Sequence, residues 1–139
     1  LNNSAQKANK KRLIEAVAMV KERANTISEL WGLMKYLFVD PKEYDEKSLK
    51  KIKKKGLGKI CSEIVSLCEN RGDSAGFMDS LKVWGEENGF GAGQIMMTTR
   101  TILVGELSGI DLQKIVSFVG LEAVSRRTKV FRAGYLTIF

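Results

Sequence analysis

A single arginine interrupts an apolar segment in the last third of the chain. The sequence MMTTRTILVGELSGIDL spans residues 96–112 and carries Arg100 in a run that is otherwise uncharged up to Glu106. On a helix over roughly 95–104, Arg100 lies one turn from Met96 and from Leu103, close to the apolar stripe. Burying a guanidinium is costly unless it is paired. We therefore expect either a carboxylate partner inside the fold or a groove that a ligand enters.

Two further sets of cations could meet an anion. Arg23 precedes the sequence TISE at 26–29, which has the spacing of a helix capping box, so it should close a first long helix. There it could complement the helix dipole or present its fork to a base edge or a phosphate. Six lysines lie between Lys47 and Lys55. They could neutralise phosphates without reading sequence, or they could simply form a solvated helix face.

The elements that would position these side chains are predicted to be helices. Apolar residues recur at spacings of three and four, and alternation typical of strands is scarce. The periodic stripes contain Leu13, Val17, Val20 and Ala24, then Ile27, Leu30, Met34 and Leu37, then Ile60, Ile64 and Leu67, then Phe77, Leu81 and Trp84. Trp31, Tyr36 and Phe38 are expected to pack in a core. We predict an all-α bundle or cage of about eight helices.

Charge suggests a division of the chain into two small subdomains, residues 1–72 and 73–139. The net charge is +7, and residues 1–72 hold 16 Lys/Arg against 9 Asp/Glu, whereas residues 73–139 hold 7 of each. A basic half joined to a neutral half suits a module that meets a polyanion on one side. A plain solvated lysine surface remains the competing interpretation.

Composition limits the kinds of catalytic and metal chemistry that are open to the chain, and it bears on the cellular compartment. The chain has no histidine, which removes the commonest general base and the commonest metal ligand. Cys61 and Cys68 are seven residues apart on one helical face, where buried, reduced thiols are expected. No apolar stretch reaches the length of a membrane helix, and residues 1–13 lack the order of a secretory signal. We expect a cytoplasmic protein, and Leu1 in place of Met suggests a piece of a longer polypeptide.

The order of motifs resembles the C-terminal end of bacterial glutamyl-tRNA synthetases. The resemblance rests on GFGAGQIMMTTRTILVGELSGIDLQKIVSFVGLEAVSRR at 89–127 and on VAMVKERANTISELWGLMKYLF at 17–38. In that family this region is an α-helical cage of two subdomains that grips the tRNA anticodon. The resemblance implies that the chain is the anticodon-binding part of a glutamate–tRNA ligase, with tRNA-Glu as its partner and the catalytic domain upstream in the same polypeptide.

The family's roles carry over position by position as implications of the resemblance. Arg23 matches an arginine that contacts the third anticodon base, and Arg100 matches one in the last subdomain. Gly109, Ile110 and Leu112 match the loop and helix start that cradle the bases, partly through backbone groups. Independently of the resemblance, the charge of the lysine run predicts weak phosphate contacts at Lys50, Lys51, Lys53 and Lys54. No catalytic residue, metal or cofactor is expected in this region, because ATP and glutamate would bind the catalytic domain; a monomer is expected.

Two other classes of function stay open at the level of sequence. A helical protein-interaction module without RNA binding would show an exposed apolar groove, with Arg100 in a salt bridge inside the core. An independent enzyme would need a cleft with paired ionisable groups, and no spacing in the sequence promises one.

Overall fold

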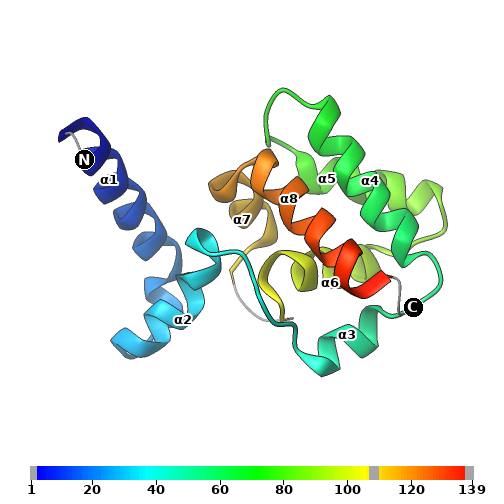
Figure 1. Ribbon diagram of the computed structural model, residues 1–139, viewed down its shortest axis with the longest axis horizontal. Helices are drawn as coiled ribbons and strands as arrows, with labels where there is room; N and C mark the ends of the chain where they lie inside the picture. The colour runs from blue at the N-terminus through cyan, green and yellow to red at the C-terminus, as the bar shows by residue number, and fades with distance from the viewer. Residues whose placement is uncertain (1–2, 107–109, 137–139) are drawn as a thin grey trace. The chain divides into compact units, whose positions relative to one another are not determined.

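The computed structural model describes residues 3–106 and 110–136, and it is built from helices (Figure 1). The described residues contain eight α-helices, one 3₁₀-helix and one short π-helix, and no strand. The predicted all-α class and the number of helices are therefore confirmed. The chain forms two compact units, residues 1–39 and residues 40–139. The predicted boundary near residue 72 lies inside the second unit, and a division into RNA-binding subdomains at that point stays a prediction.

The first unit is a pair of helices joined by a tight turn. It contains α1 (Asn3–Val20), η1 (Lys21–Arg23) and α2 (Ile27–Phe38). Ala16 and Val20 of α1 are buried, as are Met34 and Leu37 of α2, and α1 packs against α2. The sequence TISE forms the predicted cap, because Thr26 Oγ1 accepts a hydrogen bond from the backbone N–H of Glu29 at 3.1 Å.

Several large apolar side chains of the first unit lie in solvent. Trp31 is 48% exposed and Phe38 is 40% exposed, so the prediction that they pack in a core is wrong, whereas Tyr36 is half-buried. Leu13 is 45% exposed and Ile27 is 86% exposed. Two helices share one contact face, and over residues 3–39 no third α-helix packs on the apolar residues beside that face.

The second unit is a bundle of six α-helices. It contains α3 (Glu46–Ile52), α4 (Leu57–Asn70), α5 (Phe77–Glu87), α6 (Ala92–Val104), α7 (Leu112–Val119), α8 (Leu121–Phe131) and the π-helix η2 (Arg132–Leu136). Helix α8 packs most extensively against α4, and it also contacts α6 and α7 (Figure 1). The largest fully buried side chains of this core are Ile52, Ile60, Ile64, Phe77, Leu81, Ile95, Ile102, Leu103, Leu112, Ile115 and Phe131.

The segment that opens the second unit runs across the C-terminal end of α6. The backbone N–H of Asp45 donates to the carbonyl of Gly105 at 2.8 Å. Gly105 has φ +79°, and a Cβ there would lie 2.7 Å from the carbonyl oxygen of Glu43. Both the left-handed backbone and the close approach of another chain segment therefore require glycine. Tyr44, on the same segment, makes edge-to-face contacts with Phe131 and Tyr135.

Both cysteines are buried and free, as predicted. Burial raises the pKa of Cys61 to about 12 and the pKa of Cys68 to about 11. Both thiols are therefore protonated at neutral pH, which makes them poor nucleophiles. Within the described ranges, no helix is long and apolar enough to cross a membrane.

Candidate nucleic-acid interface

Arg100 lies in the middle of α6, and its guanidinium is held by the chain itself. Its Nη1 donates to the backbone carbonyl of Ile110 at 2.7 Å. The side chain is half-buried, whereas Ile102 and Leu103 of the same helix are fully buried. The predicted position beside the apolar stripe is therefore correct. The bond to Ile110 ties α6 to the residue just before the N-cap of α7, so the direction of the guanidinium is fixed by main chain rather than left to solvent.

Two of the residues predicted to cradle a base with Arg100 have buried side chains. Ile110 is 3% exposed and Leu112 is 0% exposed, so both side chains belong to the core. Gly109 lies outside the described residues. Asp111 is the N-cap of α7 and accepts from the backbone N–H of Lys114 at 3.1 Å. The anticodon-binding roles of Gly109, Ile110 and Leu112 stay predictions.

Arg23 is the last residue of η1 in the first unit, and its side chain is exposed. The backbone just after it is fixed by the cap of α2, where Glu29 Oε2 accepts from the N–H of Asn25 at 2.6 Å. An arginine on a short, well-anchored turn presents a planar fork with little backbone freedom, which suits recognition of a base edge or a phosphate. Arg23 belongs to the first unit and Arg100 to the second.

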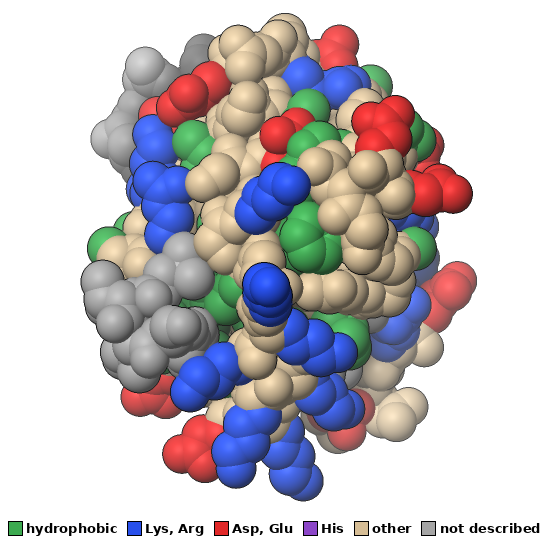
Figure 2. All heavy atoms as spheres, turned by 90° about the vertical axis from the view of Figure 1, so that its right-hand side faces the viewer, with side chains coloured by type: hydrophobic (Ala, Val, Ile, Leu, Met, Phe, Trp, Pro, Cys, Tyr) green, Lys and Arg blue, Asp and Glu red, His purple; other side chains and the backbone are tan. Residues whose placement is uncertain are grey.

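The lysine run lies on α3 and the turn that follows it. Lys50, Lys51, Lys53 and Lys54 are all exposed, whereas Ile52 is 1% exposed and packs in the core. Asp45 caps α3 by accepting from the N–H of Ser48 at 3.0 Å, which begins the helix in the register that turns the lysines outward. Figure 2 shows Lys and Arg side chains close together in the lower half of one face. Such a face can attract a phosphate backbone, though it carries no means of reading sequence.

A charged cluster that the sequence did not single out lies at the start of the second unit. Arg126 binds the Asp40 carboxylate with both arms of its fork, Nε to Oδ2 at 2.7 Å and Nη2 to Oδ1 at 2.9 Å. Arg127 Nε also donates to Asp40 Oδ1 at 2.9 Å. The hydrogen bond from Arg126 is the largest cause that lowers the pKa of Asp40 to about 2, and Arg127 adds to it.

Arg127 is a buried arginine with a carboxylate partner, which is one of the two arrangements that the spacing argument left open for Arg100. It is 3% exposed, and its Nη1 donates to the carbonyl of Leu103 at 2.9 Å. Burial lowers its pKa from the ordinary value, and the hydrogen bond to Asp40 opposes that shift. The signal was present in the sequence, because Val124, Arg127 and Phe131 share the three- and four-residue spacing of one helix face.

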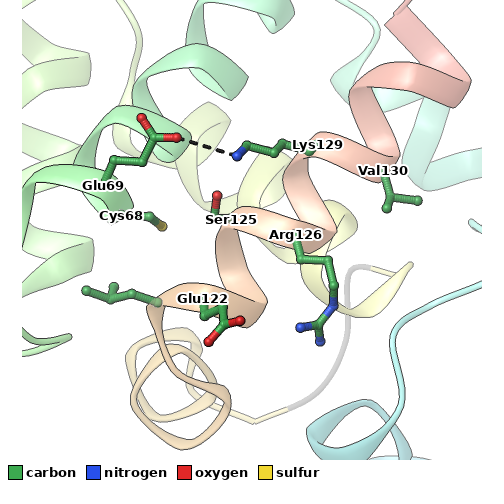
Figure 3. A pocket seen from close by; sticks show the side chains of 8 residues that line it. Cys68, Glu69, Glu122, Ser125, Arg126, Lys129 and Val130 are labelled. Atoms are coloured by element: carbon green, nitrogen blue, oxygen red, sulfur yellow. Dashed lines mark ion pairs between the residues drawn. The ribbon is translucent and has the colours of Figure 1, made fainter.

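An open hollow of about 580 Å³ lies between α4 and α8 (Figure 3). Lys129 faces Glu69 across it, with 3.4 Å between Nζ and Oε1, while Arg126 points away from that pair. Cys68 lines the hollow with its protonated thiol. Among the described residues, no group of three or more His, Cys, Asp or Glu side chains is placed to hold a metal ion.

Comparison with known proteins gives one family match that covers most of the chain. Residues 1–131 match the family described as "Anticodon binding domain". Among curated relatives, the glutamate–tRNA ligase of Flavobacterium johnsoniae is 38% identical over 120 residues, which is 84% of this chain and 24% of the relative. That of Porphyromonas gingivalis strain W83 is 34% identical over 124 residues, which is 88% of this chain and 25% of the relative.

A solved structure gives the same picture at the level of fold. The structure of a glutamate tRNA ligase from Elizabethkingia meningosepticum superposes with a TM-score of 0.77 at 24% identity, covering 89% of this chain and 25% of that chain. The chain thus spans about a quarter of the length of the relatives it matches. These matches confirm the resemblance drawn from the motifs. They also favour the anticodon-binding interpretation over the protein-interaction module.

Proposed function

The chain belongs to the anticodon-binding domain family, and from that premise we propose that it is the tRNA anticodon-binding part of a glutamate–tRNA ligase. In this proposal the chain recognises the anticodon of tRNA-Glu so that the whole enzyme attaches glutamate to it during translation. The observation that carries the proposal is the family match over residues 1–131. The names of the relatives, all glutamate–tRNA ligases, supply the amino acid.

Catalysis is assigned to the rest of the enzyme rather than to this chain. ATP and glutamate would bind the part of the ligase that the relatives carry outside the shared quarter. A cytoplasmic location belongs to the same proposal, because a translation enzyme of this kind works where tRNA is charged. A monomeric state is a separate part of the proposal. The contribution of this chain is then to raise affinity and selectivity for one tRNA, not to bind the reacting groups.

We assign the recognition of bases and the attraction of phosphates to different residues. Arg23 offers an exposed fork on an anchored turn, and Arg100 offers a half-buried fork fixed to the carbonyl of Ile110. Forked donors and main-chain groups are what read the edges of unstacked RNA bases. The lysine face of α3 adds attraction for phosphates that does not depend on sequence. We therefore assign base recognition to Arg23, Arg100 and the main chain at 109–112, and phosphate contacts to Lys50, Lys51, Lys53 and Lys54.

The test is a titration of a labelled tRNA-Glu anticodon stem-loop with the full 139-residue chain. Fluorescence anisotropy at two salt concentrations should show saturable binding that weakens as salt rises. The double variant R23A/R100A should bind at least about tenfold more weakly, since each forked base contact contributes about 1–3 kcal/mol.

The control replaces two exposed lysines, one in each compact unit. Lys21 lies on η1 beside Arg23, and Lys114 lies on α7. The variant K21A/K114A removes the same charge as R23A/R100A and should bind nearly as well as the original chain. Absence of saturable binding, or equal binding by R23A/R100A and the original chain, would contradict the proposal.

A further inference from the structure

Arg127 connects three segments of the second unit. In the part of the chain whose side chains are described, it is the one charged residue that is buried, at 3% exposure. From α8, its Nε reaches Asp40 Oδ1 at 2.9 Å and its Nη1 reaches the carbonyl of Leu103 at 2.9 Å. A guanidinium is costly to bury unless it is paired and hydrogen-bonded. These two bonds meet that cost, and they join α8 to the opening segment of the unit and to the end of α6.

The bond to Leu103 lies at the C-terminal end of α6, where backbone carbonyls lack donors from within the helix. The last four carbonyls of a helix have no intrahelical donor. In α6 the N–H of Gly105 donates to the carbonyl of Thr101 at 2.8 Å, and Arg127 Nη1 donates to the carbonyl of Leu103. A cation at this end also complements the helix dipole. Arg127 therefore fixes the terminal turn of α6.

Arg100 stands one turn before that fixed end. It precedes Leu103 by three residues on the same helix, and its Nη1 binds the carbonyl of Ile110 at 2.7 Å. Any rotation or unwinding of the last turn of α6 would shift the backbone that carries Arg100 relative to Ile110. The direction of the Arg100 guanidinium therefore depends on the contact that Arg127 makes at Leu103.

Asp40 sets the direction of Arg127 in turn. Its Oδ1 accepts from Arg127, while Arg126, whose side chain is 52% exposed, binds both carboxylate oxygens from the solvent side. Farther along the same segment, the N–H of Asp45 binds the carbonyl of Gly105 at 2.8 Å. The opening segment is thus attached to the end of α6 both directly, at Gly105, and through Arg127.

We propose that Arg127, oriented by Asp40, is a positioning residue for Arg100: it fixes the end of α6 and so sets the direction in which Arg100 meets an anticodon base. This inference rests on the proposed function. Base discrimination by a fork depends on its placement to a fraction of an ångström, whereas attraction to phosphates does not. Arg127 should therefore govern selectivity between anticodons more than overall affinity.

The experiment compares two stem-loops that differ in one anticodon base, the first carrying the glutamate anticodon. Anisotropy titrations give the dissociation constant of the altered stem-loop divided by that of the glutamate stem-loop. This selectivity ratio is measured for the full chain and for R127Q and R126Q. We expect R127Q to lower this ratio by about fivefold or more, the size of one lost base contact. R126Q removes the same charge one residue away and should leave the ratio within about twofold of the original.

Circular dichroism shows whether each variant is folded, and D40N replaces R127Q in the comparison if R127Q is not. D40N keeps the Arg127 side chain but removes the charge that orients it, so it should lower the ratio as R127Q does. If R127Q is folded and its ratio is unchanged, the inference is overturned while the proposed function stays in place. If R127Q is not folded, an unchanged ratio in D40N has the same consequence. If the original chain binds neither stem-loop, the proposed function itself fails and this inference with it.

Discussion

Three arginines of this chain lie in three different environments, and burial assigns each a different role. Arg127 is 3% exposed and donates hydrogen bonds to Asp40 and to the carbonyl of Leu103. Arg100 is half-buried and ends on the carbonyl of Ile110, while Arg23 is exposed on a turn. A fully buried fork that binds two segments of the chain holds the fold together, whereas a half-buried or exposed fork lies where a ligand can reach it.

At this scale the first prediction concerns stability. D40N should lower the free energy of unfolding by about 2 kcal/mol, because Arg127 would keep its charge inside the fold without a counter-charge. R126Q should cost no more than about 0.5–1 kcal/mol, since Arg126 is half in solvent and exposed ion pairs contribute little. Urea denaturation followed by circular dichroism measures both values, and equal losses in the two variants would contradict this account of the cluster.

The second prediction at this scale follows from the lowered pKa of Asp40, which is about 2 against an ordinary 3.8. A carboxyl group whose pKa is depressed by folding stabilises the fold above its unfolded pKa, and this contribution is lost as pH falls toward the folded value. Its neighbours Arg126 and Arg127 stay charged throughout, and the pKa of Tyr44 lies far above the window, at about 12. The stability advantage of the original chain over D40N should therefore shrink between about pH 4 and pH 2.

The measurement is denaturation of both proteins at several pH values from 7 to 2. Because the other carboxyl groups titrate in both proteins, the difference between the two curves isolates Asp40. A difference that stays constant down to pH 2 would contradict the assignment.

The sequence could have predicted the burial of Arg127 but not its partner. The spacing of Val124, Arg127 and Phe131 indicates an arginine on an apolar face, by the same reasoning that drew attention to Arg100. Asp40, however, lies 87 residues away from Arg127 along the chain. Which acid reaches a buried arginine is decided by tertiary packing, which local periodicity does not contain.

At the scale of elements, periodicity predicted helices well but the buried face only in part. In the second unit the predicted stripes hold, since Ile60, Ile64, Phe77 and Leu81 are all 0% exposed. In the first unit the same reasoning placed Ile27 inside, yet it is 86% exposed. A helix in a six-helix bundle is covered from several sides, whereas each helix of a pair is covered from one side only. Sequence spacing gives the width of an apolar stripe but not the number of elements that cover it.

The prediction at this scale concerns the turn after α6. G105A should destabilise the chain by at least about 1–2 kcal/mol, because alanine disfavours φ +79° and its Cβ would meet the carbonyl of Glu43. G93A is the matched control, since nothing lies within 4 Å of a Cβ at this exposed helical position. It should stabilise the chain by about 0.5 kcal/mol. Thermal unfolding tests the pair, and similar shifts in the same direction would show that the crossing at Gly105 matters little.

At the scale of the whole molecule, positive charge is spread over both compact units. Residues 1–39 hold 7 Lys/Arg against 3 Asp/Glu, and residues 40–139 hold 16 against 13. The apparent concentration of charge before residue 72 therefore includes the lysine face of α3, which belongs to the second unit. A polyanion could be attracted by either unit, while the forked donors at Arg23 and Arg100 supply the selective contacts.

The prediction at this scale separates the two contributions by their salt dependence. Replacing Lys50, Lys51, Lys53 and Lys54 with alanine should flatten the plot of log affinity against log salt concentration. The slope falls by about 0.7 for each single-stranded phosphate contact that is lost. The preference for the glutamate anticodon over an altered one should persist, because lysines do not read bases. A slope equal to that of the original chain would show that the α3 face is only a solvated surface.

The claim that anticodon bases meet Arg23 and Arg100 is tested most directly by photocrosslinking. The full chain is mixed with a tRNA-Glu anticodon stem-loop that carries a photoreactive thiouridine within the anticodon, irradiated and digested, and the crosslinked peptides are identified by mass spectrometry. We expect crosslinks in peptides from residues 17–30 and 96–112, and we expect them to disappear when unlabelled stem-loop is added in excess. Crosslinks confined to α4, α5 and α8, with none in either predicted segment, would contradict it.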